Sequence, residues 1–404
     1  MTELSTDVLV VGGGLIGGPL TAALASAGLS VAVVDTELPS RTLDPSFDGR
    51  ASAIALAPQR ALASLGLWDA ISPHAAAIEQ IRVADGPSPL FLHYDHRDLG
   101  TEPFGWIVEN RAIRAAIGRR LSDFASVHLL APARIARLDR DPGCVSATLD
   151  DGRTVRACVA IAADGRASPT RAGAGIEVIR WDYGQIAIVC TVAHDRPHRN
   201  IAQEHFLPAG PFAILPLPGN RSSVVWTEKA RLAPAILRQD DDAFLTELSS
   251  RFGEFLGAIR VEGPRFGYPL SLQLAKAYTA PRLALAGDAA HGMHPVAGQG
   301  MNMGLRDVAA LAEVLVDAHR LGLDIGDAAV LDRYARWRRF DNLLMLGLTD
   351  GLVRLFSNAV PPVQLARDIG LAAVNRMGPL KRFFMRHAMG TVGTLPRLLR
   401  GETL

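Results

Sequence analysis

Cysteine is scarce in this sequence, and the few cysteines form no recognised pattern. The 404 residues include three of them, Cys144, Cys158 and Cys190, and none belongs to a CxxC pair. This spacing favours neither a zinc site nor a disulfide framework. A reducing, cytoplasmic compartment fits such a chain best.

Long apolar runs and an excess of charge are also missing. No stretch reaches the roughly 18–20 uninterrupted apolar residues that a membrane-spanning helix needs. The 42 basic and 41 acidic residues give a net charge of +1, which offers no general attraction for nucleic acid. The first residues, MTELSTDVLVVGGG, carry no basic region ahead of the apolar run, so we expect them to begin the fold rather than to form a signal peptide.

What is present is the composition of a globular protein, with 49% hydrophobic and 21% charged residues. Its length predicts two closely packed domains. Asp7–Val11 and Ser30–Val34 are buried-strand patterns on either side of a small-residue helix, Leu15–Ala27. This βαβ unit indicates a parallel sheet, to which Cys158–Ala163 and Leu283–Ala286 are expected to add buried strands.

The region from Trp181 to Leu274 has a different character. Segments such as Ile186–Val192 and Val224–Glu228 have strand-like patterns between turns rich in proline and glycine. The pattern predicts an antiparallel sheet inserted into the first domain, and Ile81–Leu99 is expected to contribute strands to it.

A GxGxxG motif lies between the first strand and the first helix. Glycines allow the tight turn and a close approach of the backbone to a pyrophosphate, which the N–H groups of the helix then bind. An aspartate at the end of the second strand is placed to accept hydrogen bonds from an adenosine ribose. The residues expected to bind this dinucleotide are Gly12, Gly14, Leu15, Ile16, Gly17 and Asp35.

A second site late in the chain separates FAD from NAD. A buried strand ends in Gly-Asp, where a carboxylate can accept from a ribityl hydroxyl, and a glycine-rich segment then opens the predicted helix Asn302–Arg320. The N–H groups at that helix start can stabilise negative charge on a reduced flavin. The residues expected to bind FAD here are Gly287, Asp288, Pro295, Gly298, Gly300, Met301 and Asn302.

A third element, Asp164-Gly165, is followed by Ser168 and Arg171. Taken in order, the three elements resemble those of the FAD-dependent aromatic hydroxylases whose type member acts on a hydroxybenzoate, over about residues 5–356. The resemblance implies that Asp164 contacts both FAD and an incoming NAD(P)H. It also implies that Arg50 and Arg111 lie near the flavin; a surface arginine is the alternative for either.

The same resemblance implies an α/β fold like that of para-hydroxybenzoate hydroxylase. It combines a glutathione-reductase-like FAD-binding domain with an inserted, mostly antiparallel β-sheet substrate domain and a helical C-terminus. The expected boundaries are 1–75, 105–180 and 275–355 for the discontinuous FAD-binding domain, 76–104 and 181–274 for the substrate-binding sheet, and 356–404 for the helical C-terminal segment.

Segments later in the chain resemble the ubiquinone-biosynthesis hydroxylases in particular. They are Gly210–Pro218, Val225-Trp226, His294–Asp307 and Arg339-x-Asp341-Asn342. This likeness implies an FAD-dependent monooxygenase that uses O2 and NAD(P)H, or another reductant, to hydroxylate the ring of a hydrophobic prenylated phenol through a flavin C4a-hydroperoxide. A hydroxylase of a soluble phenol and a non-catalytic flavoprotein subunit are the alternatives.

The substrate cavity is expected against one face of the second sheet, lined by Phe212, Leu215, Trp226 and Pro295. A position on the surface or in the core is the alternative for Trp226 and for the pair Glu204-His205, which is expected on the same sheet. No residue is singled out as catalytic. His291 and His294 lack a carboxylate or thiolate at ligand spacing, so no metal site is expected.

The last segment, Gly378–Leu404, is basic and amphipathic. Such a segment can lie on an anionic membrane surface, and a prenylated phenol resides in the bilayer. We therefore expect a cytoplasmic protein that contacts the inner face of the cytoplasmic membrane or joins a biosynthetic complex. A helix packed on the FAD-binding domain is the alternative for this segment.

Overall fold

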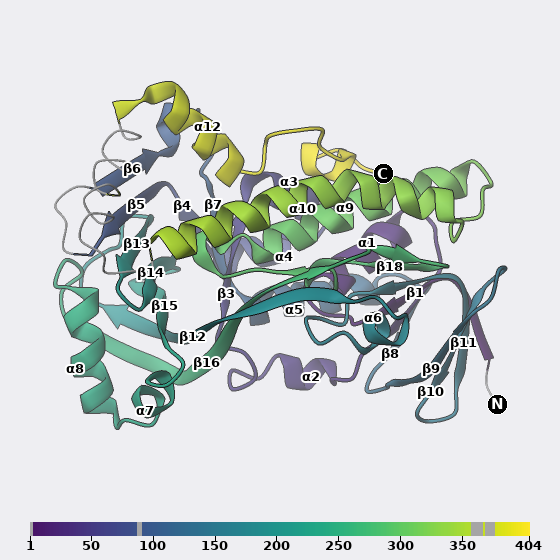
Figure 1. Cartoon of the computed structure of the whole chain (residues 1–404), viewed down its shortest axis with the longest axis horizontal. Helices are drawn as coiled ribbons and strands as arrows, with labels where there is room; N and C mark the ends of the chain where they lie inside the picture. The colour runs from purple at the N-terminus through teal and green to yellow at the C-terminus, as the bar shows by residue number, and fades with distance from the viewer. Residues whose placement is uncertain (1–2, 87–90, 357–366, 368–375) are drawn as a thin grey trace.

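The computed structural model describes residues 3–86, 91–356, 367 and 376–404. Within these residues, two β-sheets lie toward opposite ends of the molecule, and two long helices run along one side (Figure 1). This mixed architecture confirms the α/β fold class. The expected C-terminal segment, 356–404, falls partly on residues 357–366 and 368–375, which lie outside the described residues.

The inner strands of the first sheet, such as β2 (Val31–Val34) and β18 (Leu283–Leu285), are apolar and buried. The sheet contains β1 (Glu3–Val11), β2, β8 (Val127–Leu130), β9 (Ile135–Arg140), β10 (Val145–Leu149), β11 (Thr154–Ala162), β17 (Thr279–Ala280) and β18. The strand order is β17-β18-β11-β1-β2-β8, with β10 paired to β11 and β9. Strand β1 pairs in parallel with β2 and β11, as the predicted βαβ unit requires.

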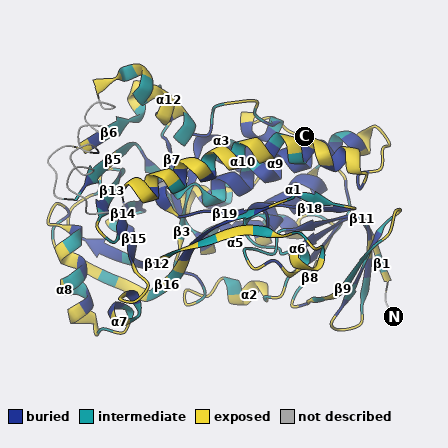
Figure 2. Ribbon diagram, viewed as in Figure 1, coloured by how far each residue is buried: buried dark blue, intermediate teal, exposed yellow. Residues whose placement is uncertain are grey.

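Helix α1 (Gly17–Ser26) is buried along most of its length because two other helices cover it (Figure 2). These are α5 (Asn110–Ser122) and α9 (Gly300–Arg320), and α10 (Ala328–Phe356) packs on α9 in turn. Small residues allow this closeness: a Cβ at Gly18 would lie only 2.3 Å from Cγ2 of Ile117 in α5.

The second sheet is almost wholly antiparallel. It contains β5 (Gln80–Asp85), β6 (Phe91–Asp95), β12 (Val178–His194), β13 (Ile201–Leu207), β14 (Gly210–Leu217), β15 (Arg221–Lys229), β16 (Ile259–Ala275) and β19 (His291–Gly292). The order is β19-β16-β12-β15-β14-β13-β5-β6, and only the β13–β5 pair is parallel among these described strands. One face packs against α7 (Ala233–Leu237) and α8 (Asp241–Phe252).

A small antiparallel sheet, β3 (Ala51–Ala55), β4 (Ala75–Ile78) and β7 (Gly105–Glu109), lies between the two larger ones. The remaining short helices are α2 (Pro39–Thr42), α3 (Leu56–Ser64), α4 (Trp68–Ile71), α6 (Pro169–Gly173), α12 (Gly378–Ala388), η1 (Ser72–His74), η2 (His96–Asp98), η3 (Gly287–Ala289), η4 (Val296–Gly298) and η5 (Arg397–Arg400).

Strand pairing follows the expected segments closely but not everywhere. Strand β12 begins at Val178, slightly ahead of the expected boundary at 181, and β19 joins the second sheet from within the segment 275–355. Pairing alone does not divide a chain into domains, so the domain boundaries stay a prediction.

Candidate functional site

The glycine loop between β1 and α1 is closed on one side and open on the other. A Cβ at Gly17 would lie 1.8 Å from the carbonyl oxygen of Gly12, and one at Gly12, where φ is +96°, would lie 2.5 Å from the oxygen of Ala163. Only glycine fits at these two positions. A Cβ at Gly14 would meet nothing within 4 Å. The loop therefore leaves space beside Gly14, in front of the N-terminus of α1.

Asp35 lies beside this loop, at the carboxyl end of β2. Its Oδ2 accepts from the backbone N–H of Gly13 at 2.7 Å, and its Oδ1 accepts from Glu37 N at 2.9 Å. Because a carboxylate has about four acceptor sites, these two bonds leave capacity for the hydroxyls of a ribose.

Asp164 follows the end of β11 and holds an unusual buried atom. Its Oδ2 accepts from Thr170 N at 3.1 Å, but Oδ1 is buried without a hydrogen-bond partner among the described residues. An unpaired buried acceptor is costly, so its presence indicates a donor that a bound molecule would bring. A Cβ at the neighbouring Gly165 would also meet nothing within 4 Å.

The later FAD element packs against Ile16 of the glycine loop, although the two are far apart in sequence. A Cβ at Gly287 would lie 2.9 Å from Cγ1 of Ile16, and one at Gly304 would lie 2.4 Å from its Cδ1. The side chains of Leu15, Ile16 and Met301 pack against the main core. All three side chains are partly buried in these contacts.

Asp288 lies in η3, directly after β18, and its side chain is 45% exposed. The Nε of Arg166 lies 3.4 Å from its Oδ2. Arg166 follows the Asp164-Gly165 element, so this contact joins the second and third motifs. Sequence reasoning did not single out Arg166.

The segment Pro295–Asn302 forms η4 and the first turn of α9. Asn302 is buried; its Oδ1 accepts from Ala55 N at 2.9 Å, and its Nδ2 donates to the oxygen of Gly298 at 3.3 Å. Gly298 has φ of +61°, and a Cβ at Gly300 would meet nothing within 4 Å. The helix start is thus fixed to β3 while its glycines leave open space.

A charged cluster centres on the buried carboxylate of Asp48. Arg50 donates to it at 2.8 and 3.0 Å, Arg114 at 2.6 Å, Asn110 at 3.0 Å and Tyr268 at 3.2 Å. Burial opposes ionisation of Asp48, but the hydrogen bonds and charge of Arg50, with the bond from Arg114, hold its pKa well below the usual range. The cluster orients Arg50, whose side chain is half exposed.

Arg111 differs from Arg50 in its contacts. Its side chain is 43% exposed and contacts the neighbouring Glu109 at 3.3 Å. Arg114, one helical turn further along α5, is the residue that reaches Asp48. Spacing along the helix could have suggested Arg114, but its partner Asp48 comes from a distant loop.

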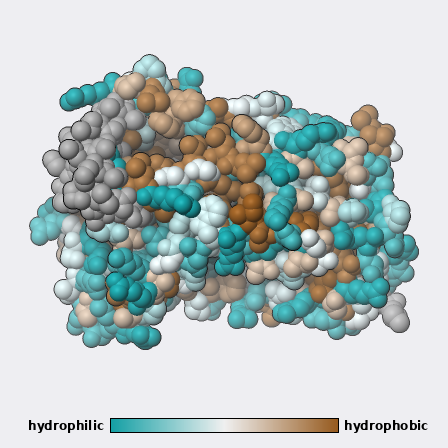
Figure 3. All heavy atoms as spheres, viewed as in Figure 1, coloured by the Kyte–Doolittle hydropathy of each residue, from teal (hydrophilic) through white to brown (hydrophobic). Residues whose placement is uncertain are grey.

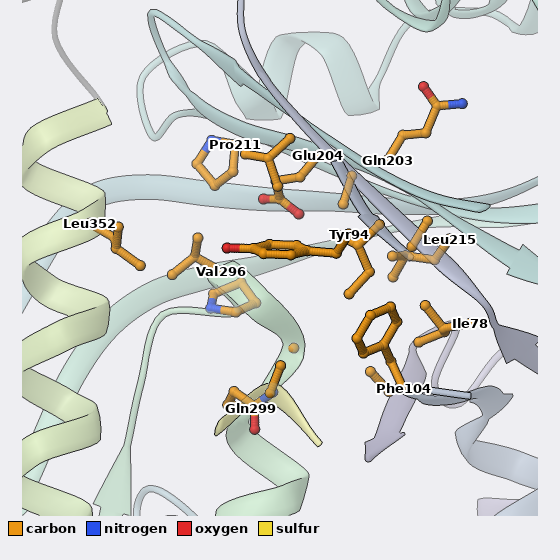
Figure 4. A pocket seen from close by; sticks show the side chains of 18 of the residues that line it. Ile78, Tyr94, Phe104, Gln203, Glu204, Pro211, Leu215, Val296, Gln299 and Leu352 are labelled. Atoms are coloured by element: carbon orange, nitrogen blue, oxygen red, sulfur yellow. The ribbon is translucent and has the colours of Figure 1, made fainter. Parts of the chain in front are cut away.

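A cavity of about 580 Å³ lies between the second sheet, η4, α10 and α12 (Figure 4). Aliphatic and aromatic side chains form most of its wall. Among the expected substrate-lining residues, Leu215 and Pro295 line it, and Gln299 and Asn302 bring the start of α9 to the same space. The predicted flavin segment and the cavity are therefore contiguous.

The expectation for Phe212 and Trp226 is wrong. Both side chains are fully buried on the opposite face of the sheet, in a core shared with Phe244 of α8. Successive side chains of a strand point to opposite faces, so Phe212 and Leu215, an odd number of residues apart, cannot line one wall.

The side chains of His291 and His294 both contact other side chains of the protein. His291 Nε2 contacts Asp307 Oδ2 at 2.6 Å, and both side chains are buried. Burial lowers the pKa of His294 to about 4, and its ring packs edge-on against Tyr183. Among the described residues, no three His, Cys, Asp or Glu side chains gather as a metal site would require.

These features fit FAD. Several features are arranged between the first strand and the cavity. They are the unpaired Asp164 oxygen, the open space at Gly14 and Gly300, and the starts of α1 and α9. A dinucleotide offers donors for the carboxylates and phosphates for the helix N–H groups.

Comparison with known proteins gives the same assignment. Residues 5–340 match the FAD binding domain family. The chain is 59% identical over 401 residues to the ubiquinone hydroxylase UbiL of Rhodospirillum rubrum, covering 98% of this chain and 93% of that protein. It is 35% identical to the 3-demethoxyubiquinol 3-hydroxylase of Escherichia coli, covering 96% of this chain and all of that protein. For human ubiquinone biosynthesis monooxygenase COQ6 the identity is 32%, with 96% and 93% covered.

Solved structures show the same fold at lower identity. The p-nitrophenol 4-monooxygenase PnpA of Pseudomonas putida DLL-E4 superposes with a TM-score of 0.82 at 21% identity, covering 98% of this chain and 100% of that one. PqsL of Pseudomonas aeruginosa, solved with 2-aminobenzoylacetate, gives 0.76 at 22% identity, covering 87% and 97%.

Proposed function

The chain belongs to the family of FAD-dependent ubiquinone-biosynthesis hydroxylases, and from this we propose that it hydroxylates the aromatic ring of a prenylated quinone precursor. The observation that carries the proposal for this chain is the apolar cavity, about 580 Å³ in volume, that adjoins the glycine-rich start of α9. A cavity of this size and lining suits a ring with an isoprenoid tail better than a small polar phenol.

The FAD site is proposed to run from Asp35 to the cavity. Asp35 would bind the adenosine ribose, the N–H groups at the start of α1 the pyrophosphate, and Asp288 a ribityl hydroxyl. The residues proposed to hold FAD are Gly12, Gly14, Leu15, Ile16, Gly17, Asp35, Arg50, Arg111, Asp164, Gly287, Asp288, Pro295, Gly298, Gly300, Met301 and Asn302. FAD, once reduced, supplies the activation of O2 and the transfer of one oxygen atom.

The protein's own part in this reaction is to position the substrate ring and to exclude water. The N–H groups at the start of α9 stabilise negative charge at the end of the cavity that the glycines leave open. Apolar side chains keep water from the reacting centre and fix the plane of the ring. NAD(P)H is proposed as a transient reductant that meets FAD near Asp164.

Turnover of purified, FAD-loaded protein with 2-geranylphenol and with phenol tests the proposal. With O2 and NADH or NADPH, we expect mass spectrometry to detect one added oxygen in the prenylated product, and a kcat/KM at least about 100-fold higher than for phenol, since the tail contributes the burial free energy. Equal turnover of both substrates would favour a hydroxylase of soluble phenols. Flavin that is never reduced or reoxidised would favour a non-catalytic flavoprotein.

We also propose a peripheral membrane contact at the cavity end of the molecule. Helix α10 exposes a stripe that includes Phe340, Leu344 and Leu348, and α12 exposes Phe383; Figure 3 shows apolar side chains gathered in this region. Among the described residues, no helix is both long and apolar enough to cross a bilayer. Membrane contact would here be a surface association, close to the residues of α10 and α12 that line the cavity.

The end of the C-terminal segment packs on the protein instead. Leu398 and Leu399 are buried in the main core, and Arg397 contacts Glu313 and Asp317 of α9. The packed-helix alternative therefore holds for η5, and the proposed membrane contact narrows to α12 and α10.

Co-sedimentation with anionic phospholipid vesicles tests this contact. Replacing both Leu348 and Phe383 by aspartate is expected to lower vesicle binding about ten-fold or more, because two apolar side chains no longer enter the interface. Leu321→Asp is the matched control, since Leu321 is equally apolar and 72% exposed but lies at the far end of α9. Binding that is negligible for the unmodified protein, or unchanged in the double variant, would contradict the proposal.

A further inference from the structure

One carboxylate stands out in the wall of the apolar cavity. Glu204 lies on β13 between Ala202 and Phe206, which also line the cavity. Its partners across the sheet, Ala213 of β14 and Val83 of β5, are apolar cavity residues as well. Strand alternation therefore points Glu204 into the cavity, and Figure 4 shows its carboxylate over the ring of Tyr94.

Nothing in the described part of the chain neutralises this carboxylate. No hydrogen bond or ion pair joins Glu204 to another described residue. Among the described residues, the other titratable side chains in the cavity wall are Tyr94 and Arg367. Arg367 donates to the buried carboxylate of Asp85 at 2.7 Å, so its charge already has a counterion.

Burial then has a clear consequence for titration. Desolvation disfavours the charged form and raises the pKa of Glu204 to about 7. It also raises the pKa of Tyr94 to about 12, so the tyrosine stays a neutral hydroxyl. The carboxylate can accordingly take up and release a proton near neutral pH, which suits a general base.

A purely structural role does not account for Glu204. An apolar side chain would avoid the cost of burying an unpaired carboxyl, and the surrounding wall is apolar. Residues that break the local packing rule without compensation are expected at functional sites. Gln299 and Asn302, which mark the proposed flavin end, line the same cavity as this carboxylate.

We propose that Glu204 binds the phenolic hydroxyl of the substrate and is the base that removes its proton, an inference that rests on the proposed function. The phenol O–H bond breaks, its electron pair stays on the phenol oxygen, and the proton moves to the Glu204 carboxylate. The resulting phenolate ring is more electron-rich and accepts the oxygen atom more readily. The proton returns to the product, so the step needs no further reactant.

The test compares Glu204→Gln with the unmodified holoenzyme across pH. We expect kcat/KM for hydroxylation of 2-geranylphenol to rise with pH through about 7 in the unmodified protein, as Glu204 loses its proton. In E204Q this limb should vanish and product formation should fall about 100-fold, while FAD content is unchanged. NAD(P)H oxidation should then yield hydrogen peroxide instead of hydroxylated product.

Glu262→Gln is the matched control, because Glu262 is a half-exposed glutamate of β16 in the same sheet, paired with Arg221. It should keep the pH profile. An E204Q variant that also keeps the profile and the product yield would overturn the assignment.

A binding measurement separates this inference from the proposed function. The dissociation constant of 2-geranylphenol from oxidised holoenzyme should rise as the pH falls through about 7 in the unmodified protein, because the protonated Glu204 carboxyl accepts more weakly from the phenolic hydroxyl, and should show no such dependence in E204Q. If the unmodified protein gives no hydroxylated product, the proposed function fails, yet the pH dependence of binding still decides the role of Glu204. A dissociation constant that does not change with pH in the unmodified protein would overturn that role.

Discussion

Replacing Gly14 by valine is expected to lower FAD affinity about 100-fold while the chain still folds. The position has open space, since a Cβ added there would have no protein atom within 4 Å. That space lies before the N-terminus of α1, where the pyrophosphate must come close to the backbone. Equilibrium dialysis of FAD against apoprotein measures the affinity, and circular dichroism measures the fold.

Gly118→Val is the control for this experiment. Gly118 is also a glycine whose Cβ would meet nothing within 4 Å, but it lies on α5, outside the glycine loop. FAD binding should be unchanged in that variant. A Gly14→Val protein that binds FAD as tightly as the unmodified protein would place the pyrophosphate elsewhere.

Replacing Asp307 by asparagine is expected to cost about 3–5 kcal/mol of folding free energy. Asp307 is fully buried; it accepts from Arg338 Nε at 2.8 Å, contacts His291 Nε2 at 2.6 Å and accepts from the N–H of Gly287 at 3.0 Å. Without its charge, the guanidinium of Arg338 stays buried with weaker compensation, and the loop bearing Asp288 loses an anchor. FAD binding should weaken together with thermal stability.

The pH dependence of this effect has a definite sign. Burial opposes ionisation of Asp307, but His291 and Arg338 hold its pKa at about 2, below the ordinary 3.8. Its contribution to stability is therefore complete above about 3.8 and is lost as the pH falls toward 2. Chemical denaturation of apoprotein at several pH values measures this, with Asp332→Asn, an exposed residue of α10, as the control. Equal stability of the two variants at neutral pH would contradict this role of Asp307.

Local motifs made part of this molecule predictable. The turn around Gly12 and Gly17 depends on neighbours in sequence, since a Cβ added at Gly17 would clash with the backbone of Gly12. Strands that end in aspartate in a parallel sheet must bring those side chains to one edge. The positions of Asp35, Asp164 and Asp288 could therefore be foreseen before the strand order was known.

Contacts between distant segments were not predictable in this way. Asp48 is satisfied by Arg114 and Tyr268, which lie 66 and 220 residues further along the chain. The face of β14 that meets the cavity depends on where α8 packs, and α8 follows later in sequence. Alternation alone could have separated Phe212 from Leu215, but it could not say which of them faces the substrate.

The position of Glu204 was predictable only in part. Its place between Ala202 and Phe206 was visible in the sequence, and the parity of the strand groups these three on one face. That this face closes an apolar cavity depends on η4, α10 and α12, which come together only in the fold.

Quinone profiling in living cells tests the central claim most directly. The gene is expressed in bacterial strains that each lack one ring hydroxylase of ubiquinone biosynthesis, and the quinones are measured by mass spectrometry. We predict that ubiquinone returns in at least one strain while the precursor lacking that hydroxyl group disappears, and that the Gly14→Val variant restores much less. Failure to restore ubiquinone in every strain, with FAD-loaded protein present in the cells, would contradict the proposed function.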